Sequence, residues 1–231
     1  INNREDAGTY FKSPNTSSER DSETNAALKE TALVLDYKNL SPGQEVGVTR
    51  IFDTDVKDLT SYKTIKMEIH YATEAEKVPV RFAIQMGEGS LEGSSNYYEW
   101  SFRPVKYECS SSERVEDCHE MNWLSNAFAM AIKTFTDMKI GRVPPYTEPV
   151  EIDLGGEREE KLKLVGNPSM TSVDWIRFVI IADEDASPAD LKGTFWLNDL
   201  RLSGMDLDWG YAARVSGQMN FSDFATVSGA M

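Results

Sequence analysis

The segment Tyr211–Phe221, Tyr-Ala-Ala-Arg-Val-Ser-Gly-Gln-Met-Asn-Phe, alternates between apolar or small residues and mostly polar ones. Successive residues of a strand point to opposite faces, so this pattern predicts a strand with one apolar and one polar face. Its eleven residues match the roughly 9–11 that a tilted strand needs to cross a bilayer. Aromatic residues flank it, as in the interfacial girdles of outer-membrane barrels: Trp209, Tyr211, Phe221 and Phe224.

The residues that follow extend this strand into a hairpin. Ser222-Asp223 forms a short turn, and 224–231 begins a second strand at which the sequence stops. We therefore expect residues 209–231 to be the start of a transmembrane barrel hairpin. Since a hairpin cannot insert alone, we also expect a piece of a larger protein, with any signal peptide outside it. A sandwich strand with one face in water is the alternative that this segment leaves open.

Length and charge bound the class of protein. The chain has 231 residues, 40% of them hydrophobic, enough for one large domain or one domain with an appendage. Its formal net charge of −14 argues against nucleic-acid binding, which selects basic patches, and is ordinarily explained by solubility. No run of 18 apolar residues occurs, so we predict no membrane-spanning helix.

Upstream of the hairpin, alternating patterns predict a mainly all-β domain. Residues 1–30 are a polar lead-in, and 31–203 are expected to form a jelly-roll-like antiparallel β-sandwich. The segment at 173–181 is apolar on both faces, which predicts a central strand. The predicted strands are 33–37, 46–52, 63–71, 80–86, 97–102, 150–154, 162–164, 173–181 and 193–202.

One inserted helix is expected at about 123–140. Its apolar residues recur at spacings of four and three, which is typical of an amphipathic helix, with a glycine at the expected end: Leu124, Phe128, Ala131, Phe135, Met138 and then Gly141.

The two cysteines, Cys109 and Cys118, lie nine residues apart in a polar segment. A zinc site would need three or four ligands, and only His119 is near. A local disulfide in an oxidising compartment therefore fits better, and two free thiols remain the alternative.

Catalytic signals are weak. Of the two histidines, His70 is expected on the solvent face of a regular strand, and His119 is next to Cys118. No serine has a nucleophile-elbow context, and no glycine-rich phosphate loop follows a strand. We predict no enzymatic role and no cofactor.

Two acidic clusters are candidates for a structural calcium ion, which takes six to eight oxygen ligands. Neither has the spacing of an EF-hand loop, so solvated acidic loops are the favoured interpretation. The residues are Asp53, Asp55 and Asp58 in one cluster and Asp183, Glu184 and Asp185 in the other.

An alternative function is sugar binding by a carbohydrate-binding-module-like sandwich of a secreted or cell-surface protein. Such modules stack aromatic rings on sugars, although these residue types more often serve strand packing. The candidates are Tyr97, Tyr98, Trp100 and Trp123.

An ordered set of short motifs resembles the SprA family, called Sov in some species, of giant outer-membrane proteins of Bacteroidetes gliding motility and type IX secretion. The resemblance runs from about residue 45 to the end, and residues 104–150 depart from it. The motifs are Phe52-Asp53, Leu59–Lys63, Met67–His70, Asn96–Glu99, Gly166–Met170 with Val173, Trp196–Leu202, Trp209–Ala213 and Asp223–Gly229.

This resemblance implies a fragment of a protein-secretion translocon, a very large β-barrel in the outer membrane. The sandwich would be inserted between barrel strands as a cap, gate or contact domain, with secreted substrate proteins, a PorV-like barrel and a plug-like protein as partners. The short turn after Phe221 should be periplasmic, which places the sandwich outside the cell, with a periplasmic location as the alternative. The lumen face would hold Arg214, Ser216, Gln218 and Asn220, and the lipid face Val215, Met219 and Phe221.

Overall fold

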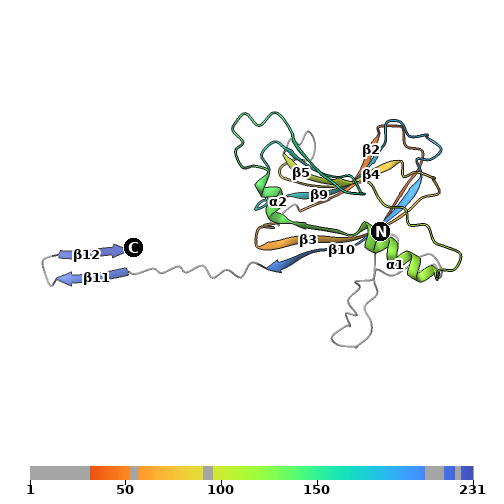
Figure 1. Cartoon of the computed structure of the whole chain (residues 1–231). Coiled ribbons are helices and arrows are strands. Elements are labelled where there is room, and N and C mark those ends of the chain that lie inside the picture. Colours follow the sequence, from red (N-terminus) through yellow and green to blue (C-terminus); the bar gives the residue numbers. More distant parts are fainter. Residues whose placement is uncertain (1–31, 53–56, 91–95, 206–215, 222–224, 231) are drawn as a thin grey trace.

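Within the described residues, ten antiparallel strands form a two-sheet sandwich in the computed structural model of the chain (Figure 1). All nine strands predicted between residues 31 and 203 are present, so the predicted antiparallel β-sandwich is confirmed. The structure describes residues 32–52, 57–90, 96–205, 216–221 and 225–230. The strands are β1 (Leu33–Tyr37), β2 (Glu45–Ile51), β3 (Tyr62–Ala72), β4 (Val80–Gly87), β5 (Tyr97–Phe102), β6 (Phe128–Ala131), β7 (Val150–Gly155), β8 (Glu160–Val165), β9 (Trp175–Ala182) and β10 (Gly193–Met205).

The larger sheet has six strands in the order β2-β9-β4-β5-β8-β7. β9 lies in its interior, hydrogen-bonded to β2 on one side and β4 on the other. Alternate residues of β9, including Phe178, face the core, while Val179 on the opposite face is also fully buried. This position explains the two apolar faces of the segment and confirms the predicted central strand.

The smaller sheet has four strands in the order β1-β10-β3-β6. β10 pairs with β3 along most of its length, and the register shifts between Asn198 and Arg201. Asp199 at this irregularity has a φ of 51°, a left-handed conformation that aspartate adopts more readily than most residues. The Trp196–Leu202 motif therefore contains a β-bulge, which bends the strand locally.

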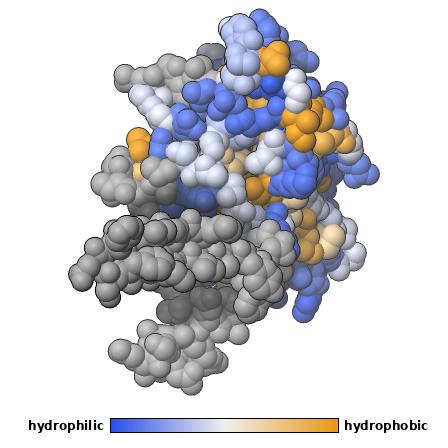
Figure 2. All heavy atoms as spheres, turned by 90° about the vertical axis from the view of Figure 1, so that its left-hand side faces the viewer, coloured by the Kyte–Doolittle hydropathy of each residue, from blue (hydrophilic) through white to orange (hydrophobic). Residues whose placement is uncertain are grey.

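Among the coloured residues of the face drawn in Figure 2, hydrophilic residues are the most common, and apolar residues form small patches between them. Such a surface agrees with the acidic composition of the chain, whose formal net charge is −14.

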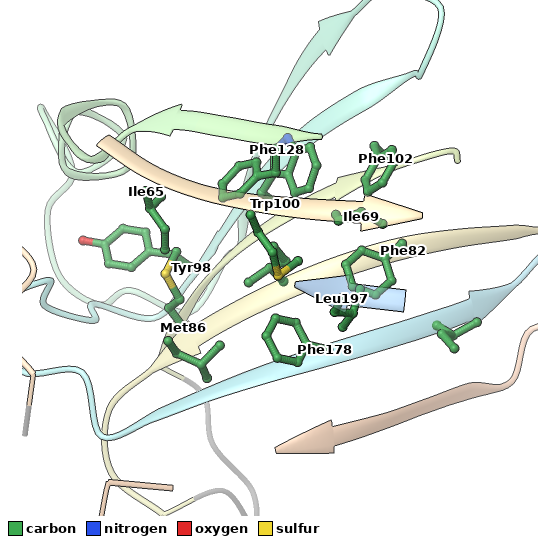
Figure 3. Packing of buried hydrophobic residues seen from close by; sticks show 14 of the residues in the cluster. Ile65, Ile69, Phe82, Met86, Tyr98, Trp100, Phe102, Phe128, Phe178 and Leu197 are labelled. Atoms are coloured by element: carbon green, nitrogen blue, oxygen red, sulfur yellow. The ribbon is translucent and has the colours of Figure 1, made fainter. Parts of the chain in front are cut away.

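The core lies between the two sheets, where alternate residues of facing strands interdigitate (Figure 3). Phe82 of β4 contacts Phe195 of β10 with ring centroids 4.9 Å apart, and Trp100 of β5 contacts Phe128 of β6 at 4.2 Å. Burial of large apolar side chains is the main source of stability in such a domain.

The prediction of one helix over 123–140 was wrong. The segment contains two helices, α1 (Val115–Asn126) and α2 (Ile132–Asp137), with strand β6 between them. α1 ends because Ala127 has an extended conformation, with φ −55° and ψ 142°, after which Phe128 pairs with Met67 of β3.

The error arose because the apolar residues of this short segment are compatible with both a helical spacing and the alternation of a strand. Phe128 and Met130 alternate as strand residues, and Phe128 is buried in the core. Ile132 and Phe135 of the short helix α2, and Met138 directly after it, recur at a spacing of three and are buried. Leu124, assigned to the helical stripe, is instead 47% exposed on α1.

After the sandwich, β11 (Ser216–Phe221) and β12 (Ala225–Ala230) form a separate two-stranded antiparallel sheet. The predicted hairpin is thus present, with Phe221 opposite Ala225 and Ser216 opposite Ala230. The predicted turn at 222–223 and the first part of the predicted strand, 211–215, lie outside the described residues.

Candidate functional site

A group of histidine and tryptophan side chains lies where α1 packs on the outer face of β3. The Nε2 atom of His70 on β3 is 2.8 Å from Nδ1 of His119 on α1. The His70 ring also stacks on Trp196 of β10, with centroids 4.5 Å apart, and lies 5.3 Å from the ring of Trp123 on α1. We call these four residues the His–Trp cluster.

The prediction that His70 faces solvent was wrong. His70 is 1% exposed and its strand neighbour Glu68 is 4% exposed, because α1 covers this part of the four-stranded sheet (Figure 1). The sequence signal that points to this arrangement is the spacing of His119 and Trp123, since residues four apart lie on one face of a helix.

Two buried asparagines and the disulfide fix α1 in this position. The Asn122 side chain accepts a hydrogen bond from the backbone N–H of Tyr71 at 2.9 Å and donates one to its carbonyl at 2.7 Å. Asn126 makes the same pair of bonds to the backbone of Val105, at 2.8 and 2.9 Å. The structure also joins Cys118 of α1 to Cys109, with Cα atoms 5.4 Å apart.

Burial makes both imidazoles weak bases. It lowers the pKa of His70 from 6.5 to about 3, with the nearby His119 as a second cause, and it also lowers the pKa of His119. The Nδ1 atom of His70 has no hydrogen-bond partner within the part of the chain that the structure describes. A proton added there would bring a charge into a buried interface, so the folded state favours the neutral ring.

We expect the free energy of unfolding to fall between about pH 7.5 and about pH 5.5. The folded-state pKa of His70 lies below its ordinary value of 6.5, so the unfolded chain takes up the proton first. This contribution of His70 to stability is therefore fully present above about pH 6.5 and is lost as the pH falls below 6.5. One proton changes the free energy by about 1.4 kcal/mol per pH unit, so a loss of about 1 kcal/mol is expected from urea unfolding curves.

The control for this prediction is His70→Gln, which should remove the part of the pH dependence that His70 contributes and leave the part of the same sign that comes from His119. Burial raises the pKa of Glu99, so this residue makes the folded state more stable, not less, as the pH falls. Glu99 is present in both the unsubstituted protein and the variant, so its contribution cancels in the comparison. An unchanged pH dependence in the variant would show that His70 is not the group responsible.

The candidate sugar-stacking aromatics do not form an exposed platform. Tyr98 is 1% exposed, and Trp100 and Trp123 are both fully buried. The hydroxyl of Tyr98 donates to the carbonyl of Pro168 at 3.0 Å, and the Trp100 indole donates to Glu160 at 3.1 Å. Tyr97 alone of the four is partly exposed. These rings serve the core and the docking of α1.

Two of the candidate calcium ligands, Asp58 and Asp183, already have protein partners. Asp58 accepts hydrogen bonds from the backbone and hydroxyl of Thr60, at 2.8 and 2.6 Å. Asp183 pairs with Arg103 at 2.6 Å, and the neighbouring Asp185 is exposed. Asp53 and Asp55 lie outside the described residues. Over the described ranges, no group of three or more histidine, cysteine or acidic side chains could hold a metal ion.

The hairpin β11–β12 has a register that matches its residue pattern. Gln218 pairs with Ser228 and Asn220 with Thr226, while Met219 pairs with Val227. Directly paired residues lie on the same face of an antiparallel sheet, so polar residues share one face and apolar residues the other. Of the predicted lumen and lipid residues, Arg214 and Val215 lie outside the described residues.

These features define the class of protein: a two-sheet β-sandwich with a helix docked on one sheet, followed by a two-faced β-hairpin. No helix among the described residues is long and apolar enough to cross a membrane.

The chain belongs to the SprA_N family of motility-related and secretion proteins, whose model matches residues 14–231. The resemblance found in the motifs is thereby confirmed, and the chain is a protein related to secretion and motility. A comparison with curated proteins gives no match.

Proposed function

We propose that this chain is part of an outer-membrane translocon for protein secretion of the type IX kind, as the SprA-like motifs imply. In this proposal β11 and β12 begin the barrel wall, and the sandwich is a non-catalytic cap, gate or contact domain. The partners would be secreted substrate proteins and the PorV-like and plug-like proteins that the resemblance implies.

The single observation that carries the proposal is the register of the hairpin. Six residue pairs, from Ser216–Ala230 to Phe221–Ala225, keep polar residues opposite polar residues and apolar opposite apolar or small ones at every internal position. A barrel strand needs this alternation, because one face meets lipid and the other meets the lumen. Membership in a secretion-related family supports the same conclusion.

The short connection between β11 and β12 favours an extracellular sandwich. Phe221 pairs directly with Ala225, so residues 222–224 alone link the two strands. Barrels keep short turns in the periplasm, and β11 would therefore run inward from the sandwich.

Sugar binding is not retained as a second function. Three of the four aromatic residues that suggested it are at most 1% exposed and pack inside the domain.

The test is fractionation of cells that express the full-length parent protein. The proposal expects a protein in the outer-membrane fraction whose mobility in detergent electrophoresis changes on heating, as barrels do. Recovery of the parent in the secreted or soluble fraction, without heat modification, would overturn it.

A further inference from the structure

Strand β7 forms an open edge of the six-stranded sheet. It pairs with β8 on one side, and no strand of the described residues lies on its other side. Open edges present unpaired backbone N–H and C=O groups, which proteins usually protect by shortening or covering the strand. β7 has six residues, and its apolar Ile152 and Leu154 are 40% and 44% exposed.

The inner face of β7 extends the apolar core of the six-stranded sheet past the edge of the four-stranded sheet that covers it. Val150 pairs with Leu164 and Ile152 with Leu162, and both leucines of β8 are fully buried in the core. Paired residues share a face, so Ile152 lies on the core side of the sheet. Its exposure means that the four-stranded sheet does not reach this edge, and an added strand would find an apolar surface there.

The outer face of the same sheet carries a row of charges that alternates in sign from strand to strand. Glu99 of β5 pairs with Lys163 of β8, which in turn pairs with Glu151 of β7. The Lys163 ammonium lies 3.4 Å from the Glu151 carboxylate, and that carboxylate side chain is 60% exposed. A second acid, Asp153, pairs with Lys161 in the next row. Both rows end in an acid at the open edge.

We propose that the β7 edge binds an extended segment of another protein in which Lys or Arg alternates with apolar residues. The segment would add a seventh antiparallel strand, with its basic residues opposite Glu151 and Asp153 and its apolar residues beside Ile152. Main-chain hydrogen bonds give such an added strand its affinity, and alternate side chains give it specificity. The proposal rests on the β7 edge of the six-stranded sheet and is independent of the barrel assignment.

A second copy of this chain is disfavoured at the same edge in the register centred on Ile152. Antiparallel pairing of two β7 strands about Ile152 would place Glu151 of one copy opposite Asp153 of the other. Like charges directly opposite each other in a sheet are destabilising.

The first test measures binding of a labelled peptide to the purified chain by fluorescence anisotropy. The probe is acetyl-Lys-Val-Lys-Val-Lys-Val-amide, and the comparison peptide, Lys-Lys-Lys-Val-Val-Val, has the same composition and charge. We expect the alternating peptide to bind at least about fivefold more tightly and to slow amide hydrogen exchange in Val150–Leu154. Equal binding of the two peptides, no binding, or protection elsewhere would overturn the proposal.

The second test uses matched surface variants, so that the overall acidity of the chain is controlled. Glu151→Gln with Asp153→Asn should weaken the alternating peptide about tenfold, since two opposite-charge pairs are lost. Glu116→Gln with Glu120→Gln removes the same charge from the exposed side of α1 and should change binding less than about twofold. Equal effects of the two double variants would show that the peptide binds by net charge alone.

Discussion

Replacing Met219 by arginine is expected to prevent assembly of the full-length parent in the outer membrane. The β11–β12 register puts Met219 opposite Val227 on the apolar face of the hairpin. An arginine on the lipid face of a barrel costs about 2–4 kcal/mol near the bilayer midplane. The measurement is the amount of heat-modifiable parent in the outer-membrane fraction, compared with the unsubstituted protein.

The matched control is Gln218→Arg, one residue away on the polar face, where Gln218 pairs with Ser228. The lumen of a barrel is polar, so this variant should assemble to nearly normal levels. Equal tolerance of both arginines, or equal loss with both, would contradict the assignment of the two faces.

The second large effect is expected for Trp100→Ala in the sandwich core. Trp100 is fully buried, stacks on Phe102 with centroids 4.6 Å apart and contacts Phe128 at 4.2 Å. Its indole N–H donates to Glu160, which is also paired with Arg158. Truncation of a buried tryptophan costs about 3–5 kcal/mol, against a typical domain stability of about 5–15 kcal/mol.

Urea unfolding measures this loss as a lower midpoint at an unchanged slope. Trp100→Phe keeps a ring in the core but loses the bond to Glu160, so an intermediate loss is expected. Ile140→Ala, at a side chain 77% exposed, should change the free energy by less than about 0.5 kcal/mol. A Trp100→Ala loss as small as that of Ile140→Ala would show that the two sheets do not pack as described.

The strands of the sandwich were predictable because apolar residues recur at every second position over the whole strand, a period that a helix does not have. In β4, Val80, Phe82, Ile84 and Met86 all face the core, so the period of two persists through the strand. β9 was predictable for the opposite reason, since burial on both faces leaves a continuous apolar run.

The region from α1 to α2 was not predictable from local pattern. Phe128 and Phe135 fit a single helical stripe, but Phe128 lies in strand β6 and packs on Trp100. Asn126, the last residue of α1, is held by hydrogen bonds to Val105, which is 21 residues away in the chain. Tertiary contacts of this kind decide between two local structures that a short apolar segment allows.

The candidate sites, too, divide into those that a local sequence pattern predicts and those that depend on residues distant in the chain. The polar and apolar faces of the hairpin follow directly from alternation and agree with the register of β11 and β12. The burial of His70 depends on a helix 49 residues later in the chain, so its strand pattern alone indicated a solvent-facing residue. The open edge at β7 required the strand order, which no local pattern contains.

The most direct test of the barrel assignment is residue-by-residue accessibility of β11 in the full-length parent. Single cysteines would replace Gln218, Met219, Asn220 and Phe221 in a background without other free cysteines. Intact cells and isolated outer membranes would then be treated with a membrane-impermeant maleimide. Labelling is expected at positions 218 and 220, with protection at 219 and 221 that is lost when detergent or heat dissociates the barrel. Equal labelling at all four positions in intact membranes would contradict the barrel assignment.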